Sequence, residues 1–447
     1  MADQQQLQHA IDQVLDRAKA AGAEADVIAS SSNNFSLKAN AGELDEYKVT
    51  SGQVIGVRIV KDEHIATSYS ESLEPASLDM MVEHALANAT YTKKDPHQTI
   101  ACANSQLTTE YPEVYQSDAA SVDDKISLAL ALEKGVVEKP NATSAPYNGF
   151  GESDSQVILA NTLGTRCYHK ERSTYCYAYT LFEKDGKQSM HGGMSTGRRF
   201  DELDPEYCIN HGYDMAKALL DGEPINTGNY SVVFDLNCLS SLFGAFGMCF
   251  SGQSAMKGIN PWRDSLHATV ASPLLTISDA AYIEGGSAIK AFDSEGFATC
   301  DTILIGEGQL QSLLHNSHTA SFFGIENTAN GSRSAKGGLG VSARHTVIAT
   351  GQSSEAELTG GEYLELIELQ GVHSGADAIS GDFSFGASGF LCRDGKRIQP
   401  VRGITVAGNF YQMIKEIDAV GDTLTHDHGK NFFAPLIRFS KLSIAGK

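Results

Sequence analysis

Hydrophobic positions near the start of the chain first follow a helical period and then alternate as in strands. The apolar face of the first predicted helix carries Leu7, Ile11, Val14, Leu15 and Ala18. Gly22 follows at a position where glycine commonly ends a helix. The stretches Ala25 to Ser31 and Phe35 to Ala39 then predict two strands. The chain therefore opens as a helix followed by strands.

A hairpin and a second helix come next. The apolar stretches Gln53 to Val60 and Ile65 to Tyr69 flank the polar turn Lys61 to His64, which predicts two antiparallel strands. Pro75 stands in the first turn of the next helix, where its missing N–H costs little. The buried face of that helix carries Leu78, Val82, Ala85, Leu86 and Ala89. This order of elements is typical of an α+β domain.

The pattern changes after residue 222, and we place a domain boundary there. Residues 156–197 contain three strand-like stretches, of which the last two meet at the turn Asp185-Gly186. A helix then covers residues 204–222, and a new apolar strand begins at Tyr230. We therefore predict an N-terminal α+β domain with β-hairpins, residues 1–224, and a C-terminal domain, residues 225–447.

The C-terminal half is rich in glycine and in short strand patterns. Helices are predicted only from Leu236 to Phe250 and from Gly308 to His318. Asp394-Gly395 is the dipeptide that two-residue hairpins prefer. The overall prediction is an α+β protein whose second domain is β-rich, with a barrel-like or strongly curved sheet.

Composition narrows the range of partners. The 447 residues include 34 basic and 55 acidic side chains, for a formal net charge of −21, which repels phosphate backbones and anionic lipids. We expect no direct nucleic-acid binding and no membrane segment, because no apolar stretch has spanning length. The 8 cysteines are scattered and form no Cys-x-x-Cys pair, which indicates reduced thiols and a cytoplasmic protein.

One glycine-rich stretch stands out in the C-terminal half, Leu369 to Phe390. Its glycines alternate with Ser, Asp and His, so it combines backbone that turns tightly with hydrogen-bonding side chains. Together with Pro400 to Asn409, this stretch resembles the C-terminal signature of the TldD/TldE (PmbA) family, in its TldE/PmbA branch. Three further motifs sit in the family's order, Gly228 to Phe234, Phe292 to Gly296 and Leu314 to Asn316. The resemblance implies a subunit of a bacterial metalloprotease that acts on peptides.

The resemblance also locates where zinc would bind in a catalytic relative. There the helix corresponding to residues 236–250 carries His-Glu-x-x-x-His, in which two imidazoles bind zinc and the glutamate is a general base. This chain has Phe243, Gly244 and Met248 in those three positions. Phenylalanine and glycine offer no ligand atom, and a thioether is a poor zinc ligand. We therefore predict no catalytic residue and no metal bound by this chain, with zinc expected in a partner subunit.

Other candidate chemistry is weaker. His315 and His318 would share a face of the second predicted helix, and His426 and His428 lie in a polar stretch, but neither pair has a third ligand beside it. Ser254 and Lys257 match Ser-x-x-Lys without the other elements of that active site. The acids Asp293 and Glu295 are interpreted as solvated loop residues.

The glycine-rich signature leaves two interpretations open. Its glycines can serve tight turns in a barrel-like sheet, or the stretch can lie beside a peptide channel and contact an extended chain. The candidate contacts are His373, Ser374, Gly375, Asp377, Asp382 and Ser384.

Two functions of different class follow from these observations. In the first, this chain is the non-catalytic partner of a zinc-bearing TldD-type subunit in a heterodimer that matures or degrades peptides, such as bacteriocin precursors, antitoxins or unfolded chains. In the second, it is a self-sufficient peptidase with an unrecognised site. The missing zinc ligands favour the first, with activity expected only in the complex, and leave homodimerisation of the isolated chain open.

Overall fold

The N-terminal lobe is one long, strongly curved antiparallel sheet. The computed structural model describes residues 3–103 and 105–447. The strand order is β3-β2-β1-β5-β6-β4, with β7 also paired to β6. The strands are β1 (Glu24–Asn40), β2 (Glu43–Lys61), β3 (His64–Ser70), β4 (Ala142–Ser144), β5 (Asn148–Asn161), β6 (Arg166–Lys184) and β7 (Lys187–Gly197).

The hairpin turns in this sheet form where the sequence predicts them. Asp62 and Glu63 join β2 to β3, and Asp185 and Gly186 join β6 to β7, with positive φ at all four residues. The first two predicted strands are in fact one, β1, because the polar residues between them pair with β2 and β5 without a break. Continuous pairing thus carries this strand through a stretch that lacks an apolar pattern.

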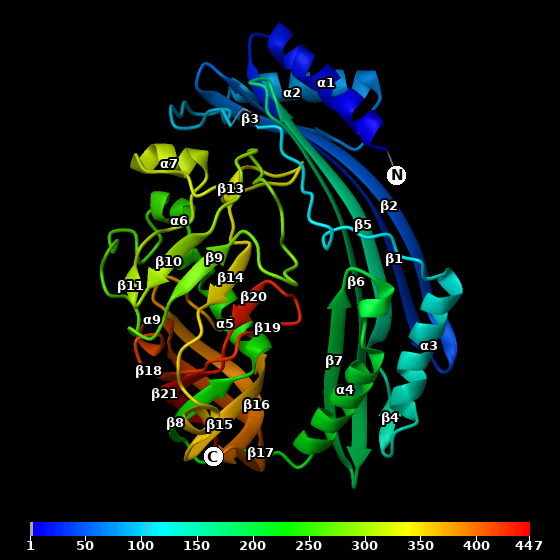
Figure 1. Cartoon of the computed structure of the whole chain (residues 1–447), viewed down its shortest axis with the longest axis vertical. Helices are drawn as coiled ribbons and strands as arrows, with labels where there is room; N and C mark the ends of the chain where they lie inside the picture. The colour runs from blue at the N-terminus through cyan, green and yellow to red at the C-terminus, as the bar shows by residue number, and fades with distance from the viewer. Residues whose placement is uncertain (1–2, 104) are drawn as a thin grey trace.

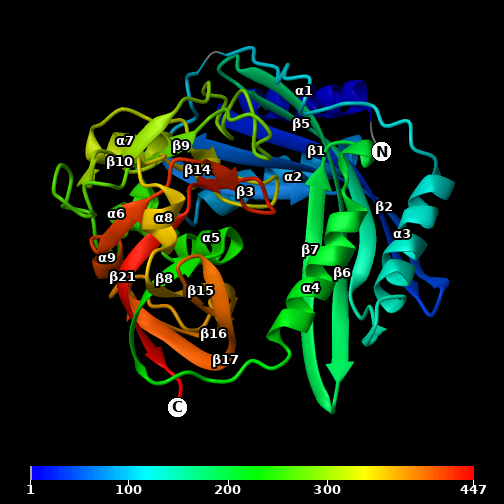
Figure 2. The same ribbon diagram turned by 60° about the horizontal axis from the view of Figure 1, so that its bottom comes forward.

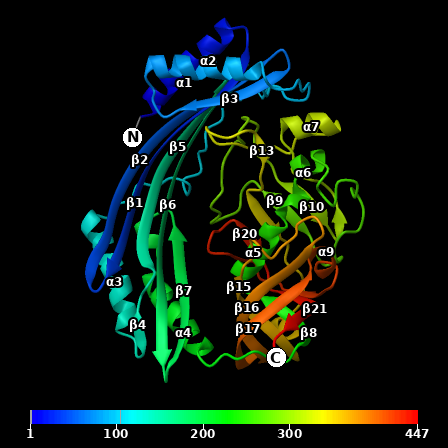
Figure 3. The same cartoon turned by 180° about the vertical axis from the view of Figure 1, so that it is seen from behind.

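Helices cover the convex face of the sheet, and the concave face looks toward the C-terminal lobe (Figures 1 and 3). The helices are α1 (Gln4–Ala20), α2 (Pro75–Ala89), α3 (Val122–Val137) and α4 (Pro205–Leu219). The predicted apolar face of α1 is buried, and a capping box between Asp3 and Gln6 fixes its start. It packs with α2 on alternate residues of β1 and β2, among them Val27 and Val57. The opposite residues of the same strands are left to face the other lobe.

A closed five-stranded barrel forms the base of the C-terminal lobe (Figure 2). Pairing of β17 with β21 closes the order β17-β16-β15-β8-β21, and β18 adds to its edge. The bounds are β8 (Gly228–Phe234), β15 (Glu362–Gln370), β16 (Asp382–Arg393), β17 (Lys396–Asn409), β18 (Ile417–Val420) and β21 (Ile437–Ala445). Asp394 and Gly395 make the predicted turn between β16 and β17. The α+β fold with a barrel-like second domain is thereby confirmed.

A second sheet lies above the barrel in the order β11-β10-β9-β14-β20-β19, with a small β12–β13 hairpin beside it. These strands are β9 (Ile277–Ala280), β10 (Thr302–Gly306), β11 (Gln309–Leu310), β12 (Gly331–Ser332), β13 (Gly340–Val341), β14 (His345–Ile348), β19 (Thr425–His426) and β20 (Phe432–Ala434). The remaining helices are α5 (Leu236–Ala245), α6 (Gly252–Met256), α7 (Ser317–Phe323), α8 (Glu355–Thr359) and α9 (Phe410–Met413), with short 3₁₀ turns at Phe200–Glu202 and Gly247–Phe250. Within the described residues, no helix has both the length and the apolar character needed to cross a membrane.

Two predicted helices in this lobe need correction. The first is shorter than expected, because α5 ends at Ala245 and a separate 3₁₀ turn continues to Phe250. The second, from Gly308 to His318, is wrong. That stretch is mostly extended, with Leu310 and Leu314 buried in the core, and α7 begins only at Ser317, where Asn316 forms a capping box.

Candidate functional site

Helix α5 covers the stretch that the resemblance compares with a zinc-binding helix, and its side chains are arranged for packing. Phe243 is buried, with its ring centroid 5.2 Å from that of Phe410 and 5.5 Å from that of Phe432. Gly244 faces open space, since no atom lies within 4 Å of where a Cβ would stand. Met248 is half-buried in the following 3₁₀ turn. Since these three residues provide no imidazole or carboxylate, the position does not fit a zinc ion.

His426 ends β19, and His428 lies in the loop that follows, which is hydrogen-bonded to α5. Asp427, between them, accepts a hydrogen bond from the Ser240 hydroxyl at 2.9 Å, and the His428 N–H donates to Asn237 Oδ1 at 2.9 Å. His426 Nδ1 lies 2.8 Å from the Asp427 carbonyl oxygen. Burial lowers the pKa of His428. Residues 427 and 428 are thus hydrogen-bonded to α5 and help to hold this helix in place.

His315 and His318 do not share a site, because they face different surroundings. His315 is buried beside Gly252, with Nδ1 3.1 Å from Thr319 Oγ1, and burial lowers its pKa to about 4. His318 reaches across to the N-terminal lobe, where Nε2 lies 2.9 Å from Asp95 Oδ2. Within residues 3–103 and 105–447, no group of three or more His, Cys, Asp or Glu side chains is placed to hold a metal ion. Ser254 is also engaged elsewhere, since its hydroxyl donates to backbone carbonyls.

The glycine-rich signature forms the connection from β15 to β16 and the beginning of β16. His373, Ser374, Asp377, Asp382 and Ser384 are exposed, and Gly375 is half-buried.

Many of the polar groups in this stretch form hydrogen bonds within the stretch or with residues 409–411. Asp377 accepts backbone N–H bonds from Ile379 and Ser380, which lower its pKa, and Asp382 Oδ1 accepts from Asn409 at 2.8 Å. The Tyr411 hydroxyl donates to the Ala378 carbonyl at 2.6 Å. The loop is thus folded against its own strand, and its other exposed side chains face solvent.

A buried cluster of four charges joins the two lobes. Arg58 Nη2 lies 2.5 Å from Asp26 Oδ2 and 3.5 Å from Glu295 Oε1, and Arg333 Nη2 lies 2.6 Å from Asp26 Oδ1. Burial opposes ionisation of Arg58, but the neighbouring Asp26 and Glu295 outweigh it and raise its pKa. Two positive and two negative groups therefore balance one another away from water.

The interpretation of Asp293 and Glu295 as solvated loop residues was wrong. Both are buried, at 6% and 1% exposure. Asp293 accepts hydrogen bonds from the backbone N–H groups of Glu295 and Phe297 in its own loop and of Gly331 in β12. Glu295 instead pairs with Arg58 in the other lobe. Burial, reinforced by Glu295, raises the pKa of Asp293. The local sequence gave no sign of burial, because Gly331 and Arg58, two of the groups that pack against these acids, lie far away in the sequence.

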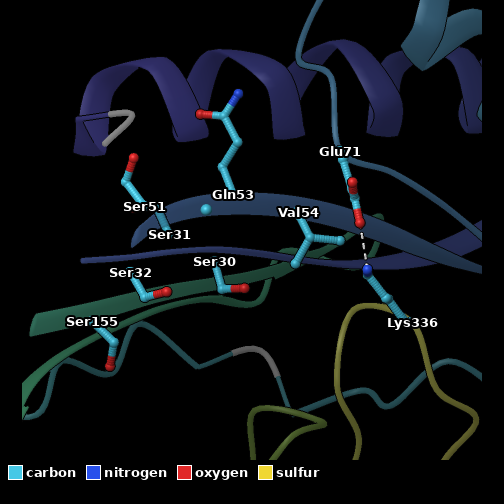
Figure 4. A pocket seen from close by; sticks show the side chains of 10 residues that line it. Ser30, Ser31, Ser32, Ser51, Gln53, Val54, Glu71, Ser155 and Lys336 are labelled. Atoms are coloured by element: carbon cyan, nitrogen blue, oxygen red, sulfur yellow. Dashed lines mark hydrogen bonds and ion pairs between the residues drawn. The ribbon is translucent and has the colours of Figure 1, made fainter. Parts of the chain in front are cut away.

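Three neighbouring cavities lie along the cleft between the concave sheet and the C-terminal lobe. The outermost measures 660 Å³ and is rich in serine, including Ser30, Ser32 and Ser155 (Figure 4). It shares Ser30 and Lys336 with a middle cavity of 280 Å³. The middle cavity in turn shares Lys290 with a third of 240 Å³. The motif Phe292 to Gly296 supplies Phe292 and Ser294 to the middle and third cavities. The sequence alone did not mark it as part of a cleft, because the other lining residues come from β1, β2, β5, β6 and a second loop of the C-terminal lobe.

The comparisons with known proteins cover nearly the whole chain. Three family models match, described as PmbA/TldA metallopeptidase domain 1 (residues 25–89), central domain (residues 115–220) and C-terminal domain (residues 227–446). The chain is 26% identical to "Metalloprotease PmbA" of Escherichia coli O157:H7 over 452 residues, covering 99% of this chain and 96% of that protein. It is 25% identical to "Metalloprotease PmbA homolog" of Haemophilus influenzae over 462 residues, covering 100% of this chain and 97% of that protein.

Two solved structures share the fold. A putative modulator of a DNA gyrase from Thermotoga maritima superposes with a TM-score of 0.87 at 24% identity, covering 98% of this chain and 100% of that one. TldE from Thermococcus kodakarensis superposes with a TM-score of 0.86 at 21% identity, with the same coverage of 98% and 100%. Both likenesses extend over the curved sheet and the barrel together.

Proposed function

We propose that this chain, which belongs to the PmbA/TldD metallopeptidase family, is the non-catalytic subunit of a two-chain peptidase. In this proposal a TldD-type partner supplies the zinc and the general base. The observation that carries it is helix α5, where Phe243, Gly244 and Met248 stand in the positions of the two histidines and the glutamate.

The packing of α5 supports the proposal that this chain keeps the family fold but lacks the zinc-binding residues. Leu242, Phe243 and Phe246 are all buried in the main core of the C-terminal lobe. Burying each such side chain contributes about 1.5–3 kcal/mol, so the helix is held without a metal ion. A subunit that completes a pseudo-symmetric enclosure needs this outcome, because such interfaces reuse equivalent surfaces on both partners.

The substrate in this proposal is an unfolded or leader peptide, bound in the enclosure in an extended form. The family assignment supports a peptide substrate, and the neighbouring cavities of the interlobe cleft provide space for one. The exposed residues of the glycine-rich connection, His373 and Ser374 among them, remain proposed contacts. The 8 cysteines are free thiols, which supports a cytoplasmic location.

The test is a pull-down from native cytosol, followed by a peptidase assay with and without a chelator. We expect a second family member that carries His-Glu-x-x-x-His to be recovered, and chelator-sensitive cleavage only in the heteromer. Replacing the glutamate of that partner should abolish cleavage, whereas replacing His315 or His318 in this chain should leave it largely intact. The proposal fails if the isolated chain contains one zinc per molecule and cleaves peptides, as a self-sufficient peptidase would.

A further inference from the structure

The middle cavity of the interlobe cleft combines apolar walls with positive charge. Its volume is 280 Å³. The apolar residues lining it are Ile28, Val54, Val157, Leu159, Phe292 and Ala335. Three cationic residues also line it, Lys290, Arg333 and Lys336, and none of the described residues in its wall is Asp or Glu. This lining contrasts with the net charge of −21 of the whole chain.

Lys290 differs from the other two cations in having no carboxylate paired with it among the described residues. Among residues 3–103 and 105–447, its ammonium has no hydrogen bond and no ion pair within 4.0 Å, and its Nζ lies 5.4 Å from the centroid of the Phe292 ring. Burial lowers its pKa, while the more distant Glu171 and Asp293 act in the opposite direction. An ammonium held in this way gains from an incoming anion that restores its lost solvation.

The two neighbouring cations are already engaged in part. Arg333 faces Asp26, but its Nε and Nη1 are buried and lack hydrogen-bond partners in the described structure. Lys336 Nζ lies 2.5 Å from Glu71 Oε1 at the outer mouth (Figure 4). A carboxylate thus compensates part of the charge of each of these two residues, whereas Lys290 has no carboxylate of the described residues within 4.0 Å.

The approach to this cavity is polar and open. Figure 4 shows Ser30, Ser32 and Ser155 on the side of the strands that faces the loop carrying Lys336, whereas Gln53 points the other way, toward α1. Hydroxyl groups along such a groove can pair with the main chain of an extended peptide. Beyond Lys290, the third cavity contains Glu171 and Asp293, which would repel an anion that moved further in.

We propose that this middle cavity binds the C-terminal carboxylate of a peptide, with Lys290 as its direct partner and the apolar walls holding the side chain of the last residue. The inference rests on the proposed function in one respect, the choice of a peptide as ligand. The preceding residues of the peptide lie along the serine-lined groove.

Size and charge favour this ligand over other anions. A cavity of 280 Å³ is smaller than the roughly 300–1,000 Å³ typical of sites for whole drug-sized ligands, so it suits one residue at the end of a longer ligand. A phosphate group is usually held by several charge-assisted donors, whereas Arg333 and Lys336 in this lining are already paired with Asp26 and Glu71. A peptide amino terminus is repelled by the same three cations.

The test measures binding of fluorescent peptides to the full chain and to its heteromer by polarisation. Three otherwise identical peptides are compared: one ends in phenylalanine with a free carboxylate, the second ends in phenylalanine amide, and the third ends in the amide but carries a glutamate in its interior. We expect the free acid to bind at least about tenfold more tightly than either amide, as befits a charge-assisted hydrogen bond. This comparison needs no variant of the protein.

Variants then locate the effect. Lys290→Gln should remove the preference for the free acid and Lys290→Arg should retain most of it, while thermal unfolding verifies that both fold. Lys441→Gln, at an exposed lysine of β21, is the matched control and should keep the full preference. Equal binding of acid and amide, absence of any peptide binding, or an equal gain from the interior glutamate would each overturn the assignment. Heteromer formation and chelator-sensitive cleavage do not depend on Lys290, so the proposed function can stand when this assignment falls.

Discussion

Phe246, just after α5, stacks on Phe410 of α9 with ring centroids 4.5 Å apart and an interplanar angle of 7°. Both rings are fully buried at 0% exposure. The end of α5 is thereby joined to the segment that follows the long barrel strand β17. In this lobe, aromatic packing holds the end of α5 in place.

Phe246→Ala should lower the free energy of unfolding by about 3–5 kcal/mol, because it leaves a cavity between α5 and α9. Denaturation in urea, followed by circular dichroism, measures the change. Phe322→Ala is the matched control: Phe322 is 41% exposed, and its loss should cost at most about 1 kcal/mol. Equal costs at the two positions would contradict the packing role of Phe246.

Two glycines should respond in opposite directions to the same added methyl group. Gly244→Ala should stabilise the protein by about 0.5 kcal/mol, since the site is open and alanine favours the helix. Gly56→Ala should cost about 1–3 kcal/mol or more, because a Cβ there would stand 1.7 Å from the Ala335 carbonyl oxygen. Unfolding curves of both variants check this, and a tolerated Gly56→Ala would mean that the Ala335 loop does not lie against β2.

The free energy of unfolding should fall on acidification, because His315 is buried in its neutral form. Its folded pKa of about 4 lies below the ordinary value near 6.5, so the unfolded chain takes up the proton first. The stability contributed by neutral His315 is therefore lost as the pH falls from about 6.5 toward 4, by up to about 3 kcal/mol. Asp293 acts in the opposite sense: its raised pKa gives stability at low pH that is lost as the pH rises.

The difference between wild type and His315→Gln separates these two contributions. The variant should lose up to about 3 kcal/mol less than wild type between neutral pH and about pH 4.5. Asp293→Asn, measured in parallel, should steepen the loss on acidification. A His315→Gln variant with the same pH profile as wild type would show that His315 is not buried in its neutral form.

The chain should not bind duplex DNA in a salt-sensitive manner. Its net charge of −21 opposes contact with phosphates, and contact with phosphates supplies most non-specific affinity for DNA. Fluorescence anisotropy of a labelled duplex, over a range of salt concentrations, should show no complex. Tight binding at physiological salt would contradict this expectation.

Local patterns predicted much of the architecture. The apolar face of α1 and the dipeptides Asp185-Gly186 and Asp394-Gly395 gave a helix and two hairpin turns correctly. These features depend on a few neighbouring residues, so they can be seen in one sequence. The helix predicted from Gly308 failed because Leu310 and Leu314 meet the core from an extended chain, and their spacing also suits a helix.

The interlobe cleft could not be predicted in the same way. Asp26 and Arg58 lie on neighbouring strands, but their partners Arg333 and Glu295 come from loops more than two hundred positions later in the chain. A charge is stable inside a protein only when its partners are also placed there. The sequence around Lys290 is likewise that of an ordinary loop, and only the folded structure places this lysine beside residues of the curved sheet.

The closure of the barrel also constrains how the protein is made. Strand β8 lies between β15 and β21 in the barrel. Its residue Tyr230 pairs with Leu442, which comes more than two hundred residues later in the sequence. During synthesis both edges of β8 remain unpaired until β15 and β21 have been made. Contacts between residues so distant in sequence also form slowly. The curved sheet is complete long before that point. The N-terminal lobe can therefore fold while the chain is still growing, whereas the C-terminal lobe, with its exposed strand edges, is the part that depends on protection from aggregation until β21 arrives.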